Sequence, residues 1–306
     1  MTQMPIDPSE TQKKLIDERN LLRKAKEYTK ADELRKQIEQ NEYILIDEGE
    51  DTYLYKELEQ KVQSGGHFLV LFGSGEISST GRQVHEEVFK RIGKDSIKIA
   101  ILTTPAGFQP NVDIVYREIG DFFVNKLQNF HPSLSYIRAN TREDCYDQNQ
   151  IHLLDDVDYI FTGPGSPTYA AKQLSNTPLL AKILSETKRG ASLSLASAAT
   201  CAFSKHVLPV YEIYKAGLPL YWEPGLNIYQ SLFQELSIIP HFNNTEGGKK
   251  TDTSYCFMGK ERFAALRNLL PLEEPVWGLD EHTGVIIDLH TKSYEVMGKG
   301  TLHPAI

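Results

Sequence analysis

Residues 191–200 read Ala-Ser-Leu-Ser-Leu-Ala-Ser-Ala-Ala-Thr, an apolar run that passes directly into a helix-forming segment. The run 191–195 is typical of a buried strand, and residues 197–206 are typical of a helix. A serine on a sharp turn from strand to helix exposes its hydroxyl, and the helix N-terminus favours negative charge developing beside it. Ser197 is therefore a candidate nucleophile.

Apolar runs alternate with helix-like stretches on both sides of this segment. The predicted strands are 68–72, 97–102, 134–137, 157–161 and 191–195. The predicted helices are 82–91, 112–127, 168–186 and 197–206. Regular alternation predicts an α/β fold with a doubly wound, mostly parallel sheet covered by helices on both faces. The later runs 237–239, 276–279, 284–288 and 293–297 predict extra strands and a terminal hairpin.

Partners for Ser197 follow other apolar runs. His241 comes after the run 238–240, and a glycine-rich turn at 163–166 follows the strand 157–161. The carboxyl ends of parallel strands meet at one edge of a sheet, so these groups should gather there. Glu212 lies in an extended-looking segment after a proline, from which its carboxylate could orient the imidazole of His241.

The order of Ser197, Glu212 and His241 resembles the dipeptidase E and cyanophycinase family of serine peptidases, whose fold is like class I glutamine amidotransferase domains. The resemblance covers residues 68–306. Family members carry the nucleophile in a Gly-x-Ser-Ala-Gly turn, and here Leu195 and Ala199 stand where the family has glycines. The resemblance implies a Ser-His-Glu triad, an acyl-enzyme, and no metal or organic cofactor.

The same resemblance implies further site residues and a substrate class. Gly165 and Ala198 would donate backbone N–H groups to an oxyanion, and Ser166 and Asn243 would contact substrate. The expected substrate is a small peptide, isopeptide or amide, since family members favour aspartyl dipeptides or aspartate-based polymers. Lysine and arginine side chains could receive a substrate carboxylate or could be solvated surface charges; they are Arg82, Lys215, Lys249 and Lys250.

Other interpretations of these residues stay open. Ser197 could be an ordinary helix N-cap, and Glu212 a surface residue. Glu281-His282 is interpreted as a structural polar pair. Cys201 lies one helical turn past Ser197 and is predicted to be a packed thiol. Because the family glycines are missing, the domain could instead be a catalytically degenerate amidotransferase-like binding module, with RNA or a protein partner recruited through the N-terminal hairpin.

The N-terminal residues 1–62 are predicted to form a domain separate from residues 67–306, with a linker at residues 63–66. Its pattern predicts helices at 11–29 and 30–40 and short strands at 43–47 and 52–55. Thr29 with Asp32 three residues later is typical of a capping box.

Segments 18–26, 30–35 and 46–52 resemble the C-terminal extension of cysteinyl-tRNA synthetase, which belongs to the tRNA-binding end of that enzyme. The resemblance implies tRNA or protein binding through residues 11–58. A solvated helical hairpin for docking or homodimer formation is an equal alternative, because the chain's net charge of -8 repels phosphate.

Composition bounds the remaining classes of protein. The chain has 306 residues, 40% of them hydrophobic, which is enough to bury a full core. Its three cysteines are widely spaced and odd in number, so we expect a reducing compartment without a disulfide framework or zinc site. No apolar run reaches about 18 residues, and the polar N-terminus does not resemble a secretory signal. A cytoplasmic protein is expected.

Overall fold

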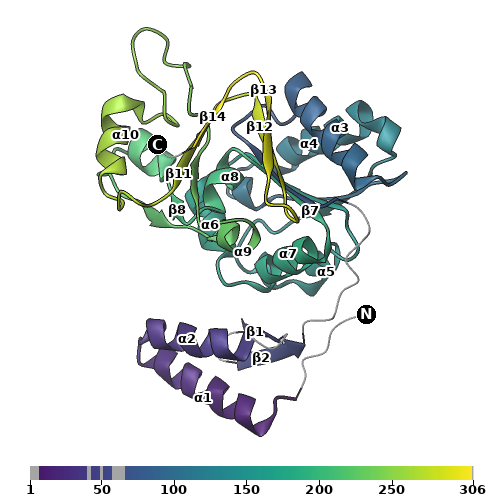
Figure 1. Ribbon diagram of the computed structural model, residues 1–306, viewed down its shortest axis with the longest axis vertical. Helices are drawn as coiled ribbons and strands as arrows, with labels where there is room; N and C mark the ends of the chain where they lie inside the picture. The colour runs from purple at the N-terminus through teal and green to yellow at the C-terminus, as the bar shows by residue number, and fades with distance from the viewer. Residues whose placement is uncertain (1–6, 40–42, 49–50, 57–65, 305) are drawn as a thin grey trace. The chain divides into compact units, whose positions relative to one another are not determined.

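The structure is a computed structural model that describes residues 7–39, 43–48, 51–56, 66–304 and 306 (Figure 1). The chain forms two compact units, and the boundary between them falls within residues 57–65. Those residues lie outside the described part of the chain. The predicted linker at 63–66 therefore falls almost wholly outside it as well.

The small unit consists of two helices and an antiparallel strand pair, as the sequence predicts. The elements are α1 (Glu10–Lys24), α2 (Tyr28–Glu39), β1 (Tyr43–Glu48) and β2 (Asp51–Lys56). Ser9 and Gln12 form the capping box, at the start of α1. The predicted cap Thr29 lies inside α2 instead. Helix α1 ends at Lys24, five residues before the predicted end, and a turn in which Lys26 has a φ of 63° leads into α2 at Tyr28.

Asp47 on β1 ties helix α1 to the strand pair. Its carboxylate accepts two hydrogen bonds of 2.6 Å from the guanidinium of Arg19, one of 2.8 Å from Thr52 Oγ1, and one from Arg23. Burial alone would raise the pKa of Asp47, but the bonds from Arg19 and Thr52 lower it to about 2. The buried guanidinium of Arg19 therefore faces an ionised carboxylate at neutral pH.

The large unit is built on a seven-stranded sheet. Its strands are β3 (Phe68–Phe72), β4 (Lys98–Leu102), β5 (Ser133–Ile137), β6 (Tyr159–Thr162), β7 (Ser192–Ala196), β12 (Thr283–Asp288) and β13 (Tyr294–Gly298). The order across the sheet is β13-β12-β3-β7-β6-β4-β5. The strands from β3 to β5 in this order are parallel, and β12 and β13 add an antiparallel edge. The predicted fold class is confirmed.

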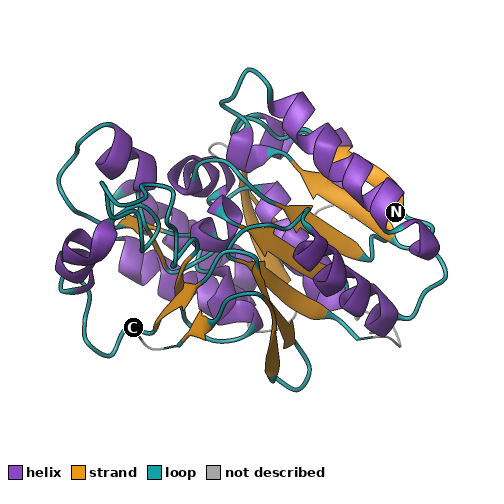
Figure 2. Ribbon diagram, turned by 90° about the horizontal axis from the view of Figure 1, so that it is seen from above, coloured by secondary structure: helices purple, strands orange, loops and turns teal. Residues whose placement is uncertain are grey.

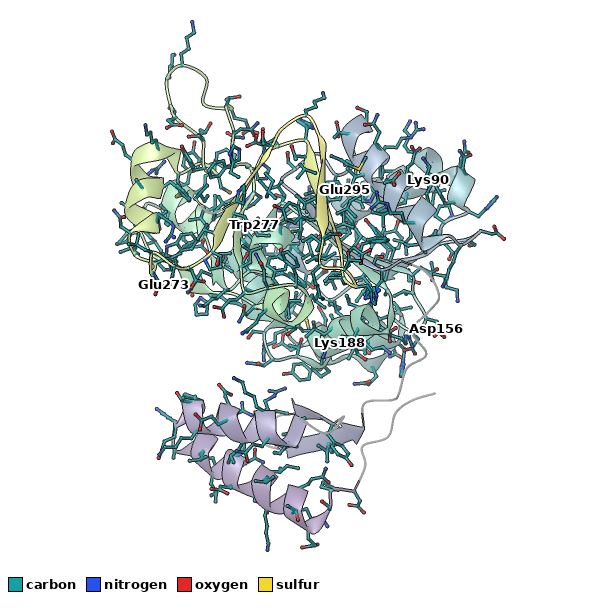
Figure 3. The ribbon with its side chains drawn as sticks, viewed as in Figure 1. Lys90, Asp156, Lys188, Glu273, Trp277 and Glu295 are labelled. Atoms are coloured by element: carbon teal, nitrogen blue, oxygen red, sulfur yellow. The ribbon has the colours of Figure 1, made fainter. Side chains whose placement is uncertain are left out.

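Helices cover both faces of this sheet (Figure 2). Alternate residues of β3 show the two layers, because successive side chains of a strand point to opposite faces. Phe68, Val70 and Phe72 pack in one cluster with α3 (Ser79–Ile92) and α4 (Val112–Lys126). Leu69 and Leu71 pack in the other cluster, with α5 (Gln148–His152), α6 (Pro167–Leu174), α7 (Pro178–Arg189) and α8 (Ala198–Ala202). The charged side chains of Lys90, Asp156 and Glu273 are exposed (Figure 3).

The remaining elements of the large unit lie outside the seven-stranded sheet. A parallel pair, β10 (Ser237–Ile239) and β11 (Val276–Leu279), is extended by antiparallel β14 (Leu302–His303). The other elements are β8 (His206–Val207), β9 (Glu223–Pro224), α9 (Ile228–Leu232), α10 (Gly259–Arg267), a π-helical turn (Tyr211–Lys215), and 3-10 turns at 104–106, 128–130 and 144–146.

Three local predictions are wrong. The predicted helix 168–186 is two helices, α6 and α7, and the second begins at Pro178, whose ring nitrogen has no hydrogen to donate. The predicted helix 197–206 ends at Ala202 and is followed by β8. The segment around Glu212 is a π-helical turn rather than an extended strand.

Within the described part of the chain, we find no helix that combines the length and apolarity needed to cross a membrane. The three cysteines are all buried.

Candidate active site

Ser197 lies on a sharp turn between β7 and α8. Its backbone has φ 52° and ψ -113°, a region that residues other than glycine seldom adopt and that stores about 1–3 kcal/mol of strain. The Ser197 N–H donates to the Phe72 carbonyl at 3.1 Å, which holds the turn against strand β3. The hydroxyl makes no capping bond to helix α8. The N-cap interpretation of Ser197 therefore does not describe its side chain.

The turn forms without the two family glycines. Leu195 is fully buried, lying opposite Leu71 and Thr162 of the neighbouring strands, so its side chain belongs to the core. Ala199 is also fully buried, and its N–H donates to the Gly163 carbonyl at 3.3 Å. The extra carbon atoms at these two positions are accommodated beside the turn.

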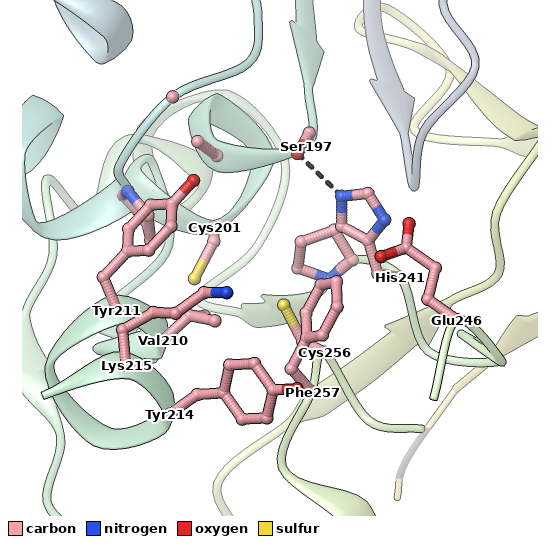
Figure 4. A pocket seen from close by; sticks show the side chains of 14 residues that line it. Ser197, Cys201, Val210, Tyr211, Tyr214, Lys215, His241, Glu246, Cys256 and Phe257 are labelled. Carbon is pink, nitrogen blue, oxygen red and sulfur yellow. Dashed lines mark hydrogen bonds between the residues drawn. The ribbon is translucent and has the colours of Figure 1, made fainter. Parts of the chain in front are cut away.

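His241 follows strand β10 of the three-stranded sheet, and its side chain meets Ser197 at the end of β7 in the seven-stranded sheet. Its Nε2 lies 2.8 Å from Ser197 Oγ, shown by the dashed line in Figure 4. The backbone N–H of His241 donates to the Gly73 carbonyl at 3.3 Å. Gly73 must be a glycine, since a Cβ there would lie 2.1 Å from the Asp280 carbonyl oxygen. The glycine turn after β3 thus anchors the histidine.

Glu281 is the carboxylate that meets the far nitrogen of this imidazole. Its Oε1 lies 2.8 Å from His241 Nδ1 and accepts a second hydrogen bond from Asn244 Nδ2 at 2.9 Å. The hydrogen bond to His241, with that from Asn244, lowers the pKa of Glu281 although burial opposes the shift. An ionised Glu281 fixes the ring so that Nδ1 carries hydrogen and Nε2 can accept the serine proton.

The prediction that Glu212 would orient His241 is corrected by this geometry. Glu212 Oε1 accepts a 2.6 Å hydrogen bond from Thr168 Oγ1. Its π-helical turn directs the carboxylate toward helix α6. The sequence signal for Glu281 was its place just after the apolar run of β11, the same feature that singled out His241 after β10.

The two predicted oxyanion donors lie beside Ser197. Gly165 and Ala198 line one cavity with the serine. Within the described residues, no acceptor pairs with the N–H of either. Gly165 has a φ of 147°, and a Cβ there would lie 2.0 Å from the Pro105 carbonyl oxygen, so only glycine fits this turn. The arrangement leaves two backbone donors available for an oxygen atom next to the nucleophile.

The structure places Ser166 and Asn243 in supporting positions outside the cavity lining. Ser166 Oγ accepts from the Tyr169 N–H at 3.2 Å and so caps α6. Asn243 Oδ1 accepts from the Glu281 N–H at 2.8 Å. Contact of these two side chains with substrate stays a prediction.

The cavity beside Ser197 has a volume of about 320 Å³ (Figure 4). Cys201 lines it from helix α8. Burial raises the pKa of the Cys201 thiol to about 12, and its sulfur accepts from the Leu208 N–H at 3.3 Å. The prediction of a packed thiol agrees with this environment. No group of three His, Cys, Asp or Glu side chains among the described residues is arranged to hold a metal ion.

Comparison with solved structures supports the description of the fold. The chain is similar to a peptidase from an acI-B1 Actinobacterium, with 22% identity, a TM-score of 0.62, and coverage of 79% of this chain and 91% of that one. It is also similar to a candidate peptidase E from Listeria monocytogenes EGD-e, with 15% identity, a TM-score of 0.51, and coverage of 77% and 100%. The fold is shared. No protein-family model matches the sequence, and the search of curated proteins found no match.

Proposed function

We propose that the large unit is a serine peptidase or amidohydrolase that cleaves a small peptide, isopeptide or amide. The observation that carries the proposal is the hydrogen-bonded series from Ser197 Oγ through His241 to Glu281, with both contacts to the imidazole at 2.8 Å. A nucleophile, a base and an orienting carboxylate in this order form the arrangement of a Ser-His-acid triad. The two similar structures, a peptidase and a candidate peptidase E, support the same class of reaction.

The first half of the reaction forms an acyl-enzyme. Ser197 Oγ attacks the amide carbonyl carbon while His241 Nε2 takes the hydroxyl proton, and Glu281 stabilises the imidazolium that results. The carbonyl oxygen becomes an oxyanion, which the N–H groups of Gly165 and Ala198 bind. One such donor typically contributes a factor of about 10²–10³ in rate. The imidazolium then protonates the leaving amine as the C–N bond breaks.

The second half releases the acid. Water attacks the ester carbon, His241 takes a proton from that water, and the same two N–H groups bind the second oxyanion. The imidazolium returns the proton to Ser197 Oγ as the ester bond breaks. No external oxidant, reductant or activated donor takes part in either half.

A fluorophosphonate probe tests this proposal, because it phosphonylates a serine only when a neighbouring base activates it. We expect one adduct per chain, lost in Ser197→Ala and in His241→Gln, with the thermal unfolding of both variants close to that of the wild type. An unlabelled wild type, under conditions that label a known serine hydrolase, would instead favour the degenerate binding module.

A further inference from the structure

The floor of the cavity beside Ser197 is apolar. It is formed in part by Cys201, Val210 and Cys256, all buried. Burial raises the pKa of both thiols, that of Cys201 to about 12, so both are neutral at physiological pH. A charged substrate group placed on this floor would lose its hydration without gaining a partner, which disfavours its binding there.

Aromatic rings form the walls above this floor. Tyr211 and Tyr214 come from the π-helical turn, and Phe257 comes from the segment after His241. The rings of Tyr214 and Phe257 have centroids 5.4 Å apart. Aromatic walls around an apolar floor favour an apolar or aromatic side chain, since burial of its surface is the main gain available there.

The charges of the cavity lie at its rim. Lys215 and Glu246 both line the cavity and are exposed. Figure 4 shows the amino group of Lys215 pointing into the cavity between the two tyrosines, with Glu246 on the opposite side next to His241. Lys215 Nζ lies 5.2 Å from the centroid of the Tyr214 ring. No carboxylate of the described residues forms an ion pair with Lys215.

A second cation near this rim is already engaged. The Arg262 guanidinium lies 5.7 Å from the centroid of the Tyr214 ring, but it donates to the carbonyls of Met258 and Phe257 at 2.6 and 2.9 Å. Lys215 is therefore the group in the cavity lining that is placed to receive a substrate carboxylate.

We infer that the substrate is a short free peptide that places an apolar or aromatic side chain in this cavity and its C-terminal carboxylate on Lys215. The inference rests on the proposed serine peptidase function. It departs from the aspartyl substrates that the family resemblance implies, because the cavity floor offers no partner to an acidic side chain. The volume of about 320 Å³ suits a ligand of two or three residues.

A panel of dipeptides tests the apolar selectivity. The panel contains Phe-Ala, Ala-Phe, Asp-Ala, Ala-Asp and Ala-Ala, compared by kcat/KM with the full-length chain. We expect the better of the two phenylalanine peptides to exceed both aspartate peptides by about 100-fold, the effect of burying one large apolar side chain. An aspartate peptide as the best substrate, or equal rates across the panel, would overturn the inference.

Lys215→Met tests the charge at the rim, and Lys249→Met, which removes an exposed lysine outside the cavity lining, is the matched control. The readout is the preference for a carboxylate terminus over a carboxamide terminus on the best peptide of the panel. We expect this preference to fall about tenfold in Lys215→Met, the usual loss for one hydrogen bond to a charged group, and to stay unchanged in Lys249→Met. An equal preference in both variants would contradict the role of Lys215.

The failure of this inference is distinguishable from failure of the proposed function. Labelling of Ser197 by the fluorophosphonate without cleavage of any phenylalanine peptide would overturn the substrate class and leave the nucleophile in place. The absence of both labelling and cleavage would overturn the proposed function and the inference with it.

Discussion

Replacement of Glu281 by glutamine should slow the reaction at Ser197 by three to four orders of magnitude. The carboxylate lies 2.8 Å from His241 Nδ1. At that separation and an effective dielectric constant of about 20, its attraction for an imidazolium is roughly 6 kcal/mol. Since each 1.4 kcal/mol is about tenfold in rate, losing most of this attraction gives a factor of about 10³–10⁴. A triad carboxylate exchanged for its amide loses a similar factor in a well-studied serine protease.

The matched control is Glu212→Gln, which changes the carboxylate that the sequence favoured. Its side chain accepts from Thr168, and an amide oxygen can accept the same bond. We therefore expect a change of less than about threefold in this variant, or about 0.6 kcal/mol, because the half-buried Glu212 carboxylate bonds Thr168 and not His241. The assay is the second-order rate constant for phosphonylation of Ser197, with thermal unfolding recorded for both variants.

Equal rate losses in the two variants, or a larger loss in Glu212→Gln, would contradict the role of Glu281. If Glu212→Gln slowed phosphonylation as much as Glu281→Gln while both variants unfolded like the wild type, Glu281 would not be the orienting carboxylate. Unchanged rates in both would show that the imidazole needs no carboxylate.

Three further predictions concern other parts of the chain. Gly165→Ala should lower the melting temperature by roughly 5–10 °C in calorimetry, because the added Cβ would lie 2.0 Å from the Pro105 carbonyl oxygen. The control is Gly217→Ala, where φ is 73° but the added Cβ would meet open space. Its melting temperature should fall by less than that of Gly165→Ala. Asp47→Asn should destabilise the small unit by roughly 2 kcal/mol, measured by hydrogen exchange of the amides of α1. Folding lowers the pKa of Asp47 from 3.8 to about 2. The stabilisation by the Asp47 carboxylate is therefore fully present above pH 3.8 and is lost as the pH falls toward 2. Treatment with iodoacetamide at pH 8 should leave fluorophosphonate labelling of Ser197 unchanged, because the Cys201 thiol has a pKa of about 12 and stays protonated. Loss of labelling after this treatment in the wild type, but not in Cys201→Ser, would contradict this.

Much of the fold could be predicted because the apolar runs are strong local signals. The run 68–72 is buried along its whole length and matches β3 residue for residue. The position of His241 at a strand end also follows from such a run. The sheet that carries it could not be predicted, because β10 belongs to the separate three-stranded sheet and not to the doubly wound sheet that carries Ser197. One local signal was misjudged: the Ser175-Asn176-Thr177-Pro178 stretch inside 168–186 is typical of a break, and the segment forms two helices, the second beginning at Pro178.

The choice of carboxylate could not be predicted from spacing. Glu212 is close to Ser197 in sequence, whereas Glu281 comes 40 residues after His241 and reaches it only because β10 and β11 are paired in parallel. Pairing between strands that are distant in the chain leaves no periodic trace in the sequence. In the sequence, Glu281 stands out only as half of the polar pair Glu281-His282.

The predicted partners and location of the chain stay predictions. Binding of tRNA or a protein through residues 11–58, homodimer formation, and a cytoplasmic location are among them. The guanidinium groups of Arg19 and Arg23 in helix α1 bind Asp47, so an RNA partner would have to use other basic residues of the small unit.

The proposed reaction depends above all on Ser197 being an activated nucleophile. Its most direct test is peptide mass spectrometry of the full-length chain after reaction with a fluorophosphonate. We expect a single adduct on the peptide that contains Ser197, formed about 10³-fold or more faster than in Glu281→Gln. No adduct, or an adduct at another residue that persists in Ser197→Ala, would contradict it.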